Sequence, residues 1–321
     1  MFYRFFKIFT KLFIQFYCSK LIVDKMELLK CNGPVLLAVN HPNSFLDAII
    51  LCTLFKEPIF SLARGDVFKN KILAKILYSL KIFPVFRSSE GVKNLDHNYT
   101  TFNECIKIFQ QGGMVLIFSE GLCLNEWQLR PLKKGTARLA IAAWQQNIPL
   151  KILPIGINYS NFQSFGKTVH INIGSFIEAK DFGNVTIKNG RLLNEITCSI
   201  HEQLQLLVYE IANNNYQKWV DTFQFSPNNL KKNFFIIPAL IGKLLNAPLY
   251  FPVQKIIARK ALYSGHYDSI MVTVLIFTYP IYLLLWSLLI HSFWEGYYFG
   301  LVFILFPFFA WCFIRTKPPS Y

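Results

Sequence analysis

The chain has 321 residues, of which 53% are hydrophobic and 17% aromatic, including 32 Phe, which is too apolar for an ordinary soluble domain. With 33 Lys and Arg against 18 Asp and Glu, the net charge of +15 indicates an anionic partner surface. The basic residues are interleaved with Phe, Leu and Ile, and no zinc-finger, RRM or helix-turn-helix pattern occurs, so an anionic membrane fits better than nucleic acid.

The first segment predicts an amphipathic helix at a membrane interface. Residues 2–23 mix Phe, Tyr, Leu and Ile with recurring Lys and Arg. They lack the uninterrupted apolar core and small-residue cleavage site of a signal peptide. Recurring cations and aromatic residues are typical of interfacial helices, although a helix packed on the globular domain has the same pattern. We assign residues 1–25 to this helix.

Residues 26–215 predict one α/β catalytic domain. Apolar, β-branched runs that predict strands cover 35–39, 59–62, 82–86, 114–118, 151–157 and 168–173. Helical patterns alternate with them at 45–55, 68–80, 99–111 and 136–146, and a further helix follows at about 194–214. This order predicts a mixed, mostly parallel sheet flanked by helices.

The turn after the first of these strands holds a His and an Asp, His41 and Asp47. An imidazole in reach of a carboxylate can deprotonate a hydroxyl, because the carboxylate fixes the tautomer and stabilises the imidazolium. No G-x-S-x-G motif supplies a nucleophile, so the base would act on the substrate's own hydroxyl. Alternatively, Ser44 and Asp47 form a capping box and residues 41–43 are a simple turn.

Three later blocks carry charged or turn-forming residues close to the ends of predicted strands. These residues are Arg87, Glu120, Gly121, Arg130, Lys133 and Lys134. Arg and Lys side chains suit a phosphate, and a helix N-terminus adds a favourable field for the same anion. Alternatively, the arginine is a solvated cation at a strand end, and the Glu-Gly and Lys-Lys pairs are only turns.

These blocks, in this order and spacing, resemble the glycerolipid acyltransferases of the 1-acylglycerol-3-phosphate and glycerol-3-phosphate O-acyltransferase type. The resemblance covers about residues 30–180. It implies that His41 is the general base and Asp47 its orienting acid. It also implies that Arg87, Glu120 and Gly121 form part of the acceptor site.

Three departures from the family pattern affect the predicted site. Five residues separate His41 from Asp47 where the commonest pattern has four, so their contact requires a local bulge or a shifted helix start. This spacing resembles that of some glycerol-3-phosphate acyltransferases. Ser119 replaces the usual Pro, and residues 122–123 (Leu-Cys) replace a polar and basic pair. Arg130, Lys133 and Lys134 are candidates for the phosphate contact that this pair would make.

The C-terminal third predicts the membrane anchor. Residues 216–268 hold several prolines and predict an irregular membrane-proximal segment, and residues 269–314 predict two transmembrane helices. Lys and Arg flank this hairpin on both outer sides, which places both ends in the cytoplasm. A second His/Asp run, residues 265–268, lies at the mouth of the first helix, and we assign it no catalytic role.

Together these features imply an integral enzyme of the cytoplasmic membrane whose catalytic domain faces the cytoplasm. It would transfer a fatty acyl chain from acyl-CoA or acyl carrier protein to glycerol 3-phosphate or lysophosphatidate. No metal or bound cofactor is expected, and the seven scattered Cys predict reduced thiols. The alternatives are an acyltransferase for a lyso-aminolipid and a catalytically inactive, lipid-binding member of the fold.

Overall fold

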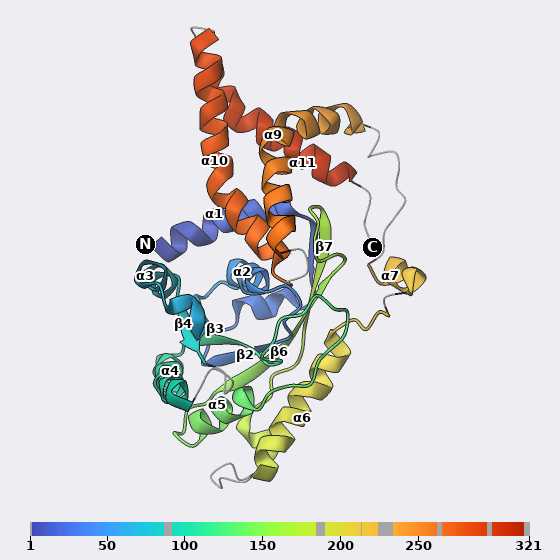
Figure 1. The fold of residues 1–321 in the computed structure, drawn as a ribbon. Coiled ribbons are helices and arrows are strands. Elements are labelled where there is room, and N and C mark those ends of the chain that lie inside the picture. The colour runs from blue at the N-terminus through green and yellow to red at the C-terminus, as the bar shows by residue number, and fades with distance from the viewer. Residues whose placement is uncertain are drawn as a thin grey trace.

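A seven-stranded sheet with helices on both faces carries a group of long helices at one end (Figure 1). The computed structural model describes residues 2–86, 92–183, 190–212, 214–223, 234–261, 265–293 and 297–317. The predicted α/β class, with a mostly parallel sheet, is confirmed.

The strands run in the order β1-β7-β6-β2-β5-β3-β4. Their bounds are β1 Cys18–Val23, β2 Val35–Val39, β3 Ile59–Arg64, β4 Ile82–Val85, β5 Met114–Phe118, β6 Lys151–Tyr159 and β7 Lys167–Ile173. The run from β6 to β4 is parallel, whereas β7 is antiparallel to β6. All six predicted strands are present within two residues of their expected ends.

Helices cover the two faces of the sheet through separate apolar cores. Alternate residues of β2 point to opposite faces, as a strand requires. One core contains α1 (Phe2–Tyr17), α2 (Phe45–Leu54) and part of α10. The other contains α4 (Val92–Gln110), α5 (Gly135–Trp144) and α6 (Gly190–Leu207). The described residues also form the helices α3 (Lys71–Ser79) and α7 (Tyr216–Phe223). Because β2 is covered on both faces, its end is a rigid support for the turn that follows.

The predicted N-terminal helix is shorter than expected. α1 ends at Tyr17, and Cys18–Val23 forms the edge strand β1, which pairs in parallel with β7. Phe5, Ile8 and Leu12 leave an exposed apolar stripe at the i, i+3, i+7 spacing of one helix face. Ile14 and Tyr17 are buried against the domain. One face of α1 therefore packs on the domain, and the other leaves an apolar stripe exposed.

Within the described residues, three C-terminal helices are long and apolar enough to cross a membrane, by length and composition alone. α10 (Tyr267–Phe293) and α11 (Val302–Thr316), with a short 3-10 turn at Tyr297–Leu301, correspond to the two predicted helices. The third, α9 (Ile236–Ala261), lies in the segment predicted to be irregular. That prediction was wrong because Pro248 and Pro252 lie inside a continuous apolar helix, where proline bends a helix without ending it.

α9 is bent: its first part lies away from the sheet, and only its last part runs toward the domain (Figure 1). At its beginning, Phe235 packs against Trp311 near the end of α11, with ring centroids 5.7 Å apart. In its middle, the carbonyl of Leu245 accepts from the hydroxyl of Tyr282, halfway along α10. At its end, Ala261 packs in the cluster formed around the first turns of α10.

Candidate active site

The predicted site lies where two neighbouring parallel strands end and their connections diverge. β2 and β5 are adjacent, with His41 following β2 and Glu120 following β5. The chain leaves β2 through α2 toward β3, and it leaves β5 through α5 toward β6, on the opposite face. In open α/β sheets, ligands bind in the crevice at such a switch point, outside the carboxyl ends of the strands.

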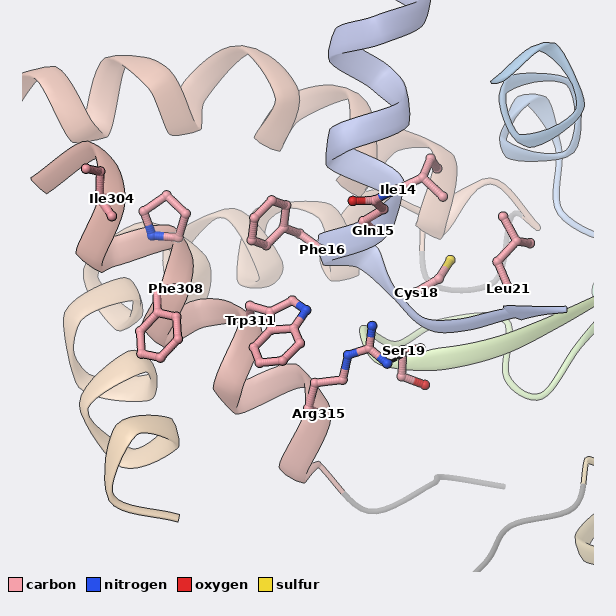
Figure 2. A pocket seen from close by; sticks show the side chains of 11 residues that line it. Ile14, Gln15, Phe16, Cys18, Ser19, Leu21, Ile304, Phe308, Trp311 and Arg315 are labelled. Carbon is pink, nitrogen blue, oxygen red and sulfur yellow. Dashed lines mark hydrogen bonds between the residues drawn. The ribbon is translucent and has the colours of Figure 1, made fainter. Parts of the chain in front are cut away.

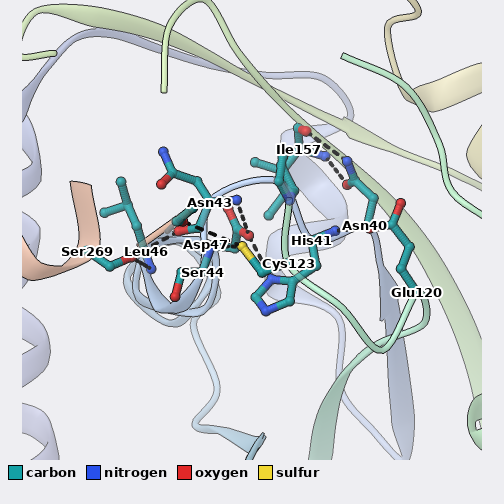
Figure 3. Close-up of polar contacts among 12 residues, drawn as sticks. Asn40, His41, Asn43, Ser44, Leu46, Asp47, Glu120, Cys123, Ile157 and Ser269 are labelled. Atoms are coloured by element: carbon teal, nitrogen blue, oxygen red, sulfur yellow. Dashed lines mark hydrogen bonds and ion pairs between the residues drawn. The ribbon is translucent and has the colours of Figure 1, made fainter. Parts of the chain in front are cut away.

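His41 and Asp47 are in contact (Figure 3). Nδ1 of His41 lies 2.9 Å from Oδ2 of Asp47, whose side chain is fully buried, whereas the His41 side chain is 17% exposed. The imidazole stacks on Phe118, at the end of β5, with ring centroids 3.7 Å apart. Because the carboxylate holds Nδ1, the other ring nitrogen, Nε2, is the one left to take a proton from a substrate.

A single strained residue accommodates the long spacing between His41 and Asp47. Ser44 has φ 55° and ψ −142°, a region that residues with a side chain rarely adopt. Such a conformation costs about 1–3 kcal/mol. α2 begins directly after it, at Phe45. The sharp backbone change at Ser44 lets Asp47, on the first turn of α2, reach back to the imidazole.

The alternative capping box is not formed. Ser44 is the N-cap of α2, but its side chain makes no capping hydrogen bond, and its hydroxyl pairs with Nδ1 of His266 at 2.7 Å. The Asp47 carboxylate accepts from the backbone N–H of Asn43 at 2.9 Å and from the hydroxyl of Tyr159 at 2.7 Å. Asp47 therefore orients the turn and the imidazole.

Glu120 holds the backbone around the imidazole. Its Oε2 accepts from the N–H of His41 at 2.9 Å, and its Oε1 accepts from the N–H of Arg130 at 3.0 Å. Burial raises the pKa of Glu120, while the two N–H groups act in the opposite direction. Gly121 follows with φ 65°, a conformation that favours glycine and turns the chain away. Both carboxylate oxygens are thus already engaged within the fold.

The predicted lysine pair lies at the end of β5, beside the start of α5. The N–H of Lys133 donates to the carbonyl of Ser119 at 2.7 Å, and its side-chain stem lies against Gly121. Lys134 directly precedes α5. Both charges therefore stand near the positive end of a helix dipole, close to the turn that holds His41, which is a favourable arrangement for an anion.

The arginines are placed less clearly. Arg130 forms an ion pair with Glu126 at 3.0 Å, with both side chains partly exposed. Arg87 lies outside the described residues. Arg64, which was not among the predicted site residues, ends β3 at the same end of the sheet, and its Nε donates to Asp66 at 3.0 Å. Arg64 is therefore a further cation on this edge.

Some residues that hold the turn with His41 and Asp47 were not predicted, because they lie far from it along the chain. Tyr159 lies at the end of β6, two residues beyond the predicted end of that strand, and reaches Asp47. Burial, followed by the neighbouring Asp47, raises the pKa of Tyr159, so its hydroxyl stays protonated and donates. Asn40 pairs twice with the backbone of Ile157, through 3.1 and 2.7 Å bonds. Both contacts tie the turn to β6.

Cys123 takes part in the fold of the turn. Its Sγ accepts from the N–H of Ser44 at 2.9 Å and lies 3.8 Å from the carbonyl of Gly265. Burial raises the pKa of Cys123 to about 12, so the thiol stays protonated at neutral pH and is a poor nucleophile. The residue that replaces a basic side chain in the family pattern thus has a packing role here.

The start of α2 has few free donors for an oxyanion. The backbone N–H groups of 41, 43, 44, 46 and 47 all donate within the fold. These bonds occupy most of the backbone donors at the start of α2.

A separate cavity of about 610 Å³ lies between α1, β1 and α11 (Figure 2). Its lining is mostly apolar and includes Phe16, Phe308 and Trp311, with Arg315 at one side. The Arg315 guanidinium lies 5.2 Å from the centre of the Trp311 ring. Of the predicted site residues that the structure describes, none lines this cavity, so it is distinct from the His41 site.

Comparisons with known proteins bear on the His41 site. Residues 20–158 match the family model described as Acyltransferase. Among solved structures, the chain is similar to the crystal structure of the 1-acyl-sn-glycerophosphate (LPA) acyltransferase PlsC from Thermotoga maritima. That similarity has 15% identity and a TM-score of 0.43 and covers 64% of this chain and 78% of the other. No curated protein gives a significant match.

Proposed function

We propose that this chain transfers a fatty acyl chain from an acyl thioester to glycerol 3-phosphate or lysophosphatidate. The match of residues 20–158 to the Acyltransferase family model supports acyl transfer as the reaction class. The single observation that carries the proposal is the 2.9 Å contact between His41 and the buried Asp47 at the carboxyl ends of β2 and β5. Acyl-CoA or acyl carrier protein is the donor.

In the proposed reaction, Nε2 of His41 takes the proton of the acceptor hydroxyl as its oxygen attacks the thioester carbonyl. Asp47 holds Nδ1 in the protonated tautomer and stabilises the imidazolium. When the tetrahedral intermediate collapses, the C–S bond breaks and the imidazolium returns the proton to the leaving thiolate. No enzyme nucleophile, metal or bound cofactor takes part.

An assay of purified protein in lipid nanodiscs tests this proposal. Radiolabelled acyl-CoA and acyl carrier protein are offered with glycerol 3-phosphate, lysophosphatidate and a lyso-aminolipid. We expect transfer to one of the two phosphate acceptors. Transfer to none of the three would contradict the proposal and favour the inactive, lipid-binding alternative.

A lyso-aminolipid acceptor is the second candidate because two positions lack the expected polar contacts. Leu122 is partly exposed, and Cys123 is engaged with the fold. Neither offers a charge to a phosphate. Transfer to the lyso-aminolipid alone in the same assay would establish this second candidate.

If the Lys133–Lys134 pair binds a phosphate, replacing both lysines with Ala should raise the acceptor KM and leave the donor KM nearly unchanged. Hydrogen bonds to charged groups contribute about 1.5–3 kcal/mol each, so a rise of at least about tenfold is expected. Steady-state kinetics with each substrate varied in turn measures both constants.

The matched control replaces Lys151 and Lys180, which both pair with Glu178 at the opposite edge of the sheet. It removes the same charge from the protein without touching the His41 site, so its acceptor KM should stay normal. An equal rise in both double variants would mean that net charge, rather than a local phosphate site, determines acceptor use.

We also propose that the domain faces the cytoplasm and that α10 and α11 cross the membrane as a hairpin. Both outer ends of the hairpin contact the domain: Asp268 pairs with Lys167 of β7, and Nζ of Lys317 donates to the carbonyl of Phe165 at 3.2 Å. These contacts support an arrangement with both ends on one side, where the thioester donor is made.

A thiol-accessibility experiment tests this topology. One variant carries Ser292→Cys, near the far end of α10, as its only cysteine, and another keeps only Cys198, which is exposed on α6. A membrane-impermeant maleimide on intact cells should label the first variant. It should label the second only after permeabilisation. Protection of the Ser292→Cys variant would mean that α10 does not cross, and labelling of Cys198 in intact cells would reverse the orientation.

A further inference from the structure

The turn that holds His41 and Asp47 is clamped by the first turn of α10. Ser269 Oγ donates to the carbonyl of Asn43 at 3.0 Å, a contact between residues 226 positions apart. The same oxygen accepts from the N–H of Leu46 at 3.2 Å. The side-chain amide of Asn43 donates to Oδ2 of Asp268 at 2.8 Å. Two neighbouring residues of one helix thus bind both sides of the turn.

Asp268 is itself held in a fixed position. Its carboxylate is fully buried, forms an ion pair with the buried Lys167 of β7, and accepts from the hydroxyl of Tyr17 at the end of α1. A buried carboxylate with a cation and two donors cannot move without losing strong contacts. The start of α10 is therefore anchored to two other elements of the domain while it binds Asn43.

The turn needs such outside support because Ser44 is strained. A strained backbone conformation persists only where contacts with the surrounding structure stabilise it by more than the strain costs. Ser44 is held on one side by Cys123 and on the other by His266, which lies just before α10. Without these contacts, relaxation of Ser44 would move Asp47 away from His41, because the strained residue lies between them.

We propose that the beginning of α10, through Ser269 and Asp268, positions the His41–Asp47 pair and compensates for the extra residue between them. The membrane hairpin is then part of the catalytic apparatus as well as an anchor. Ser269 and Asp268 are positioning residues, since they act through Asn43. The effect on turnover rests on the proposed function, whereas the effect on the shape of the turn does not.

Ser269→Ala tests the proposal because it removes both bonds of the hydroxyl and adds no bulk. A catalytic group misplaced by about 1 Å can lower turnover by about 10²-fold. We expect kcat to fall by about tenfold to 10²-fold, while the KM values for donor and acceptor stay within about twofold, because the acceptor cations lie on other elements. Thr278→Ala is the matched control, since the Thr278 hydroxyl bonds within α10, to the carbonyl of Val274 at 2.8 Å.

Cys123 supplies a second measurement that does not depend on catalysis. Its thiol lies between Ser44 and Gly265, at the junction of the turn with the α10 segment. Loosening the junction should lower its raised pKa and increase its access to solvent. Alkylation of Cys123 by iodoacetamide, followed by mass spectrometry, should become about tenfold faster in Ser269→Ala, because the loosened junction exposes a thiol that the turn shields. Thr278→Ala should react as slowly as the unmodified protein.

These measurements separate the possible outcomes. An unchanged kcat per folded molecule, or unchanged Cys123 reactivity in Ser269→Ala, would overturn the positioning role. If the unmodified protein transfers no acyl group, the proposed function fails, and Cys123 reactivity alone decides whether α10 holds the turn. If Ser269→Ala does not fold, His266→Ala removes the contact to Ser44 at a less buried position and is judged by the same two readouts.

Discussion

His41→Ala should lower acyl transfer by about 10²–10⁴-fold, the usual contribution of a general base. The His41 imidazole has a buried carboxylate partner, Asp47, and is itself partly exposed to solvent, as a general base that meets a substrate must be. Its removal also takes away a ring stacked on Phe118, so a small loss of thermal stability is expected. Turnover per folded molecule, measured with both acceptors at saturation, separates the two effects.

His201→Ala is the matched control for this substitution. His201 lies on α6, on the other face of the sheet from α2, and is partly buried. Its loss should leave turnover unchanged. If His41→Ala retained full turnover with any acceptor, the proton-transfer scheme would be wrong and the lipid-binding alternative would be favoured.

The central strands were predictable because each is a short apolar run bounded by turn residues. The edge strand β1 was not, because it continues directly from α1 without Gly or Pro between them. The alternating burial of side chains along β1 depends on its pairing with β7, and the paired residues are about 150 positions apart in the chain. From the sequence alone, the apolar residues of Cys18–Val23 extend the amphipathic pattern of the helix before them.

α9 was missed for the opposite reason. Pro248 and Pro252 are strong local signals against a regular helix. They are outweighed by packing against α10 and α11, which stabilises the bent helix through contacts such as Leu245 with Tyr282. Local propensity is a weak guide where an apolar helix has neighbours on several sides.

Within the site, the His41–Asp47 contact was predictable because both residues lie in one short turn. The groups that hold the pair were not, since Tyr159 reaches Asp47 from 112 positions away and Asp268 reaches Asn43 from 225. A single sequence gives no signal for such contacts. His266 and Asp268 could be recognised in the sequence. Their contacts with Ser44 and Asn43 could not be predicted, because they depend on where α10 meets the turn.

Asp47→Asn should lower turnover strongly, and by about 10⁴-fold if Asp47 acts as the Asp does in the Ser-His-Asp enzymes. The amide cannot stabilise an imidazolium, and it can present an N–H to Nδ1 and so select the wrong tautomer. The change should also cost about 1–3 kcal/mol of stability, because three donors point at this fully buried carboxylate. From sequence alone, a helix cap would tolerate Asn at little cost.

Tyr159→Phe separates the loss of a hydrogen bond from the loss of the charge. It removes one of the three donors to Asp47 and leaves His41 and the carboxylate in place. Its stability should fall by about 1 kcal/mol, comparable to Asp47→Asn, while its turnover should fall only a few-fold. Thermal unfolding and single-turnover acyl transfer, measured on both variants, give the comparison. Equal losses of turnover in the two variants would mean that Asp47 acts only through the shape of the turn, and that its charge has no part in the proton transfer.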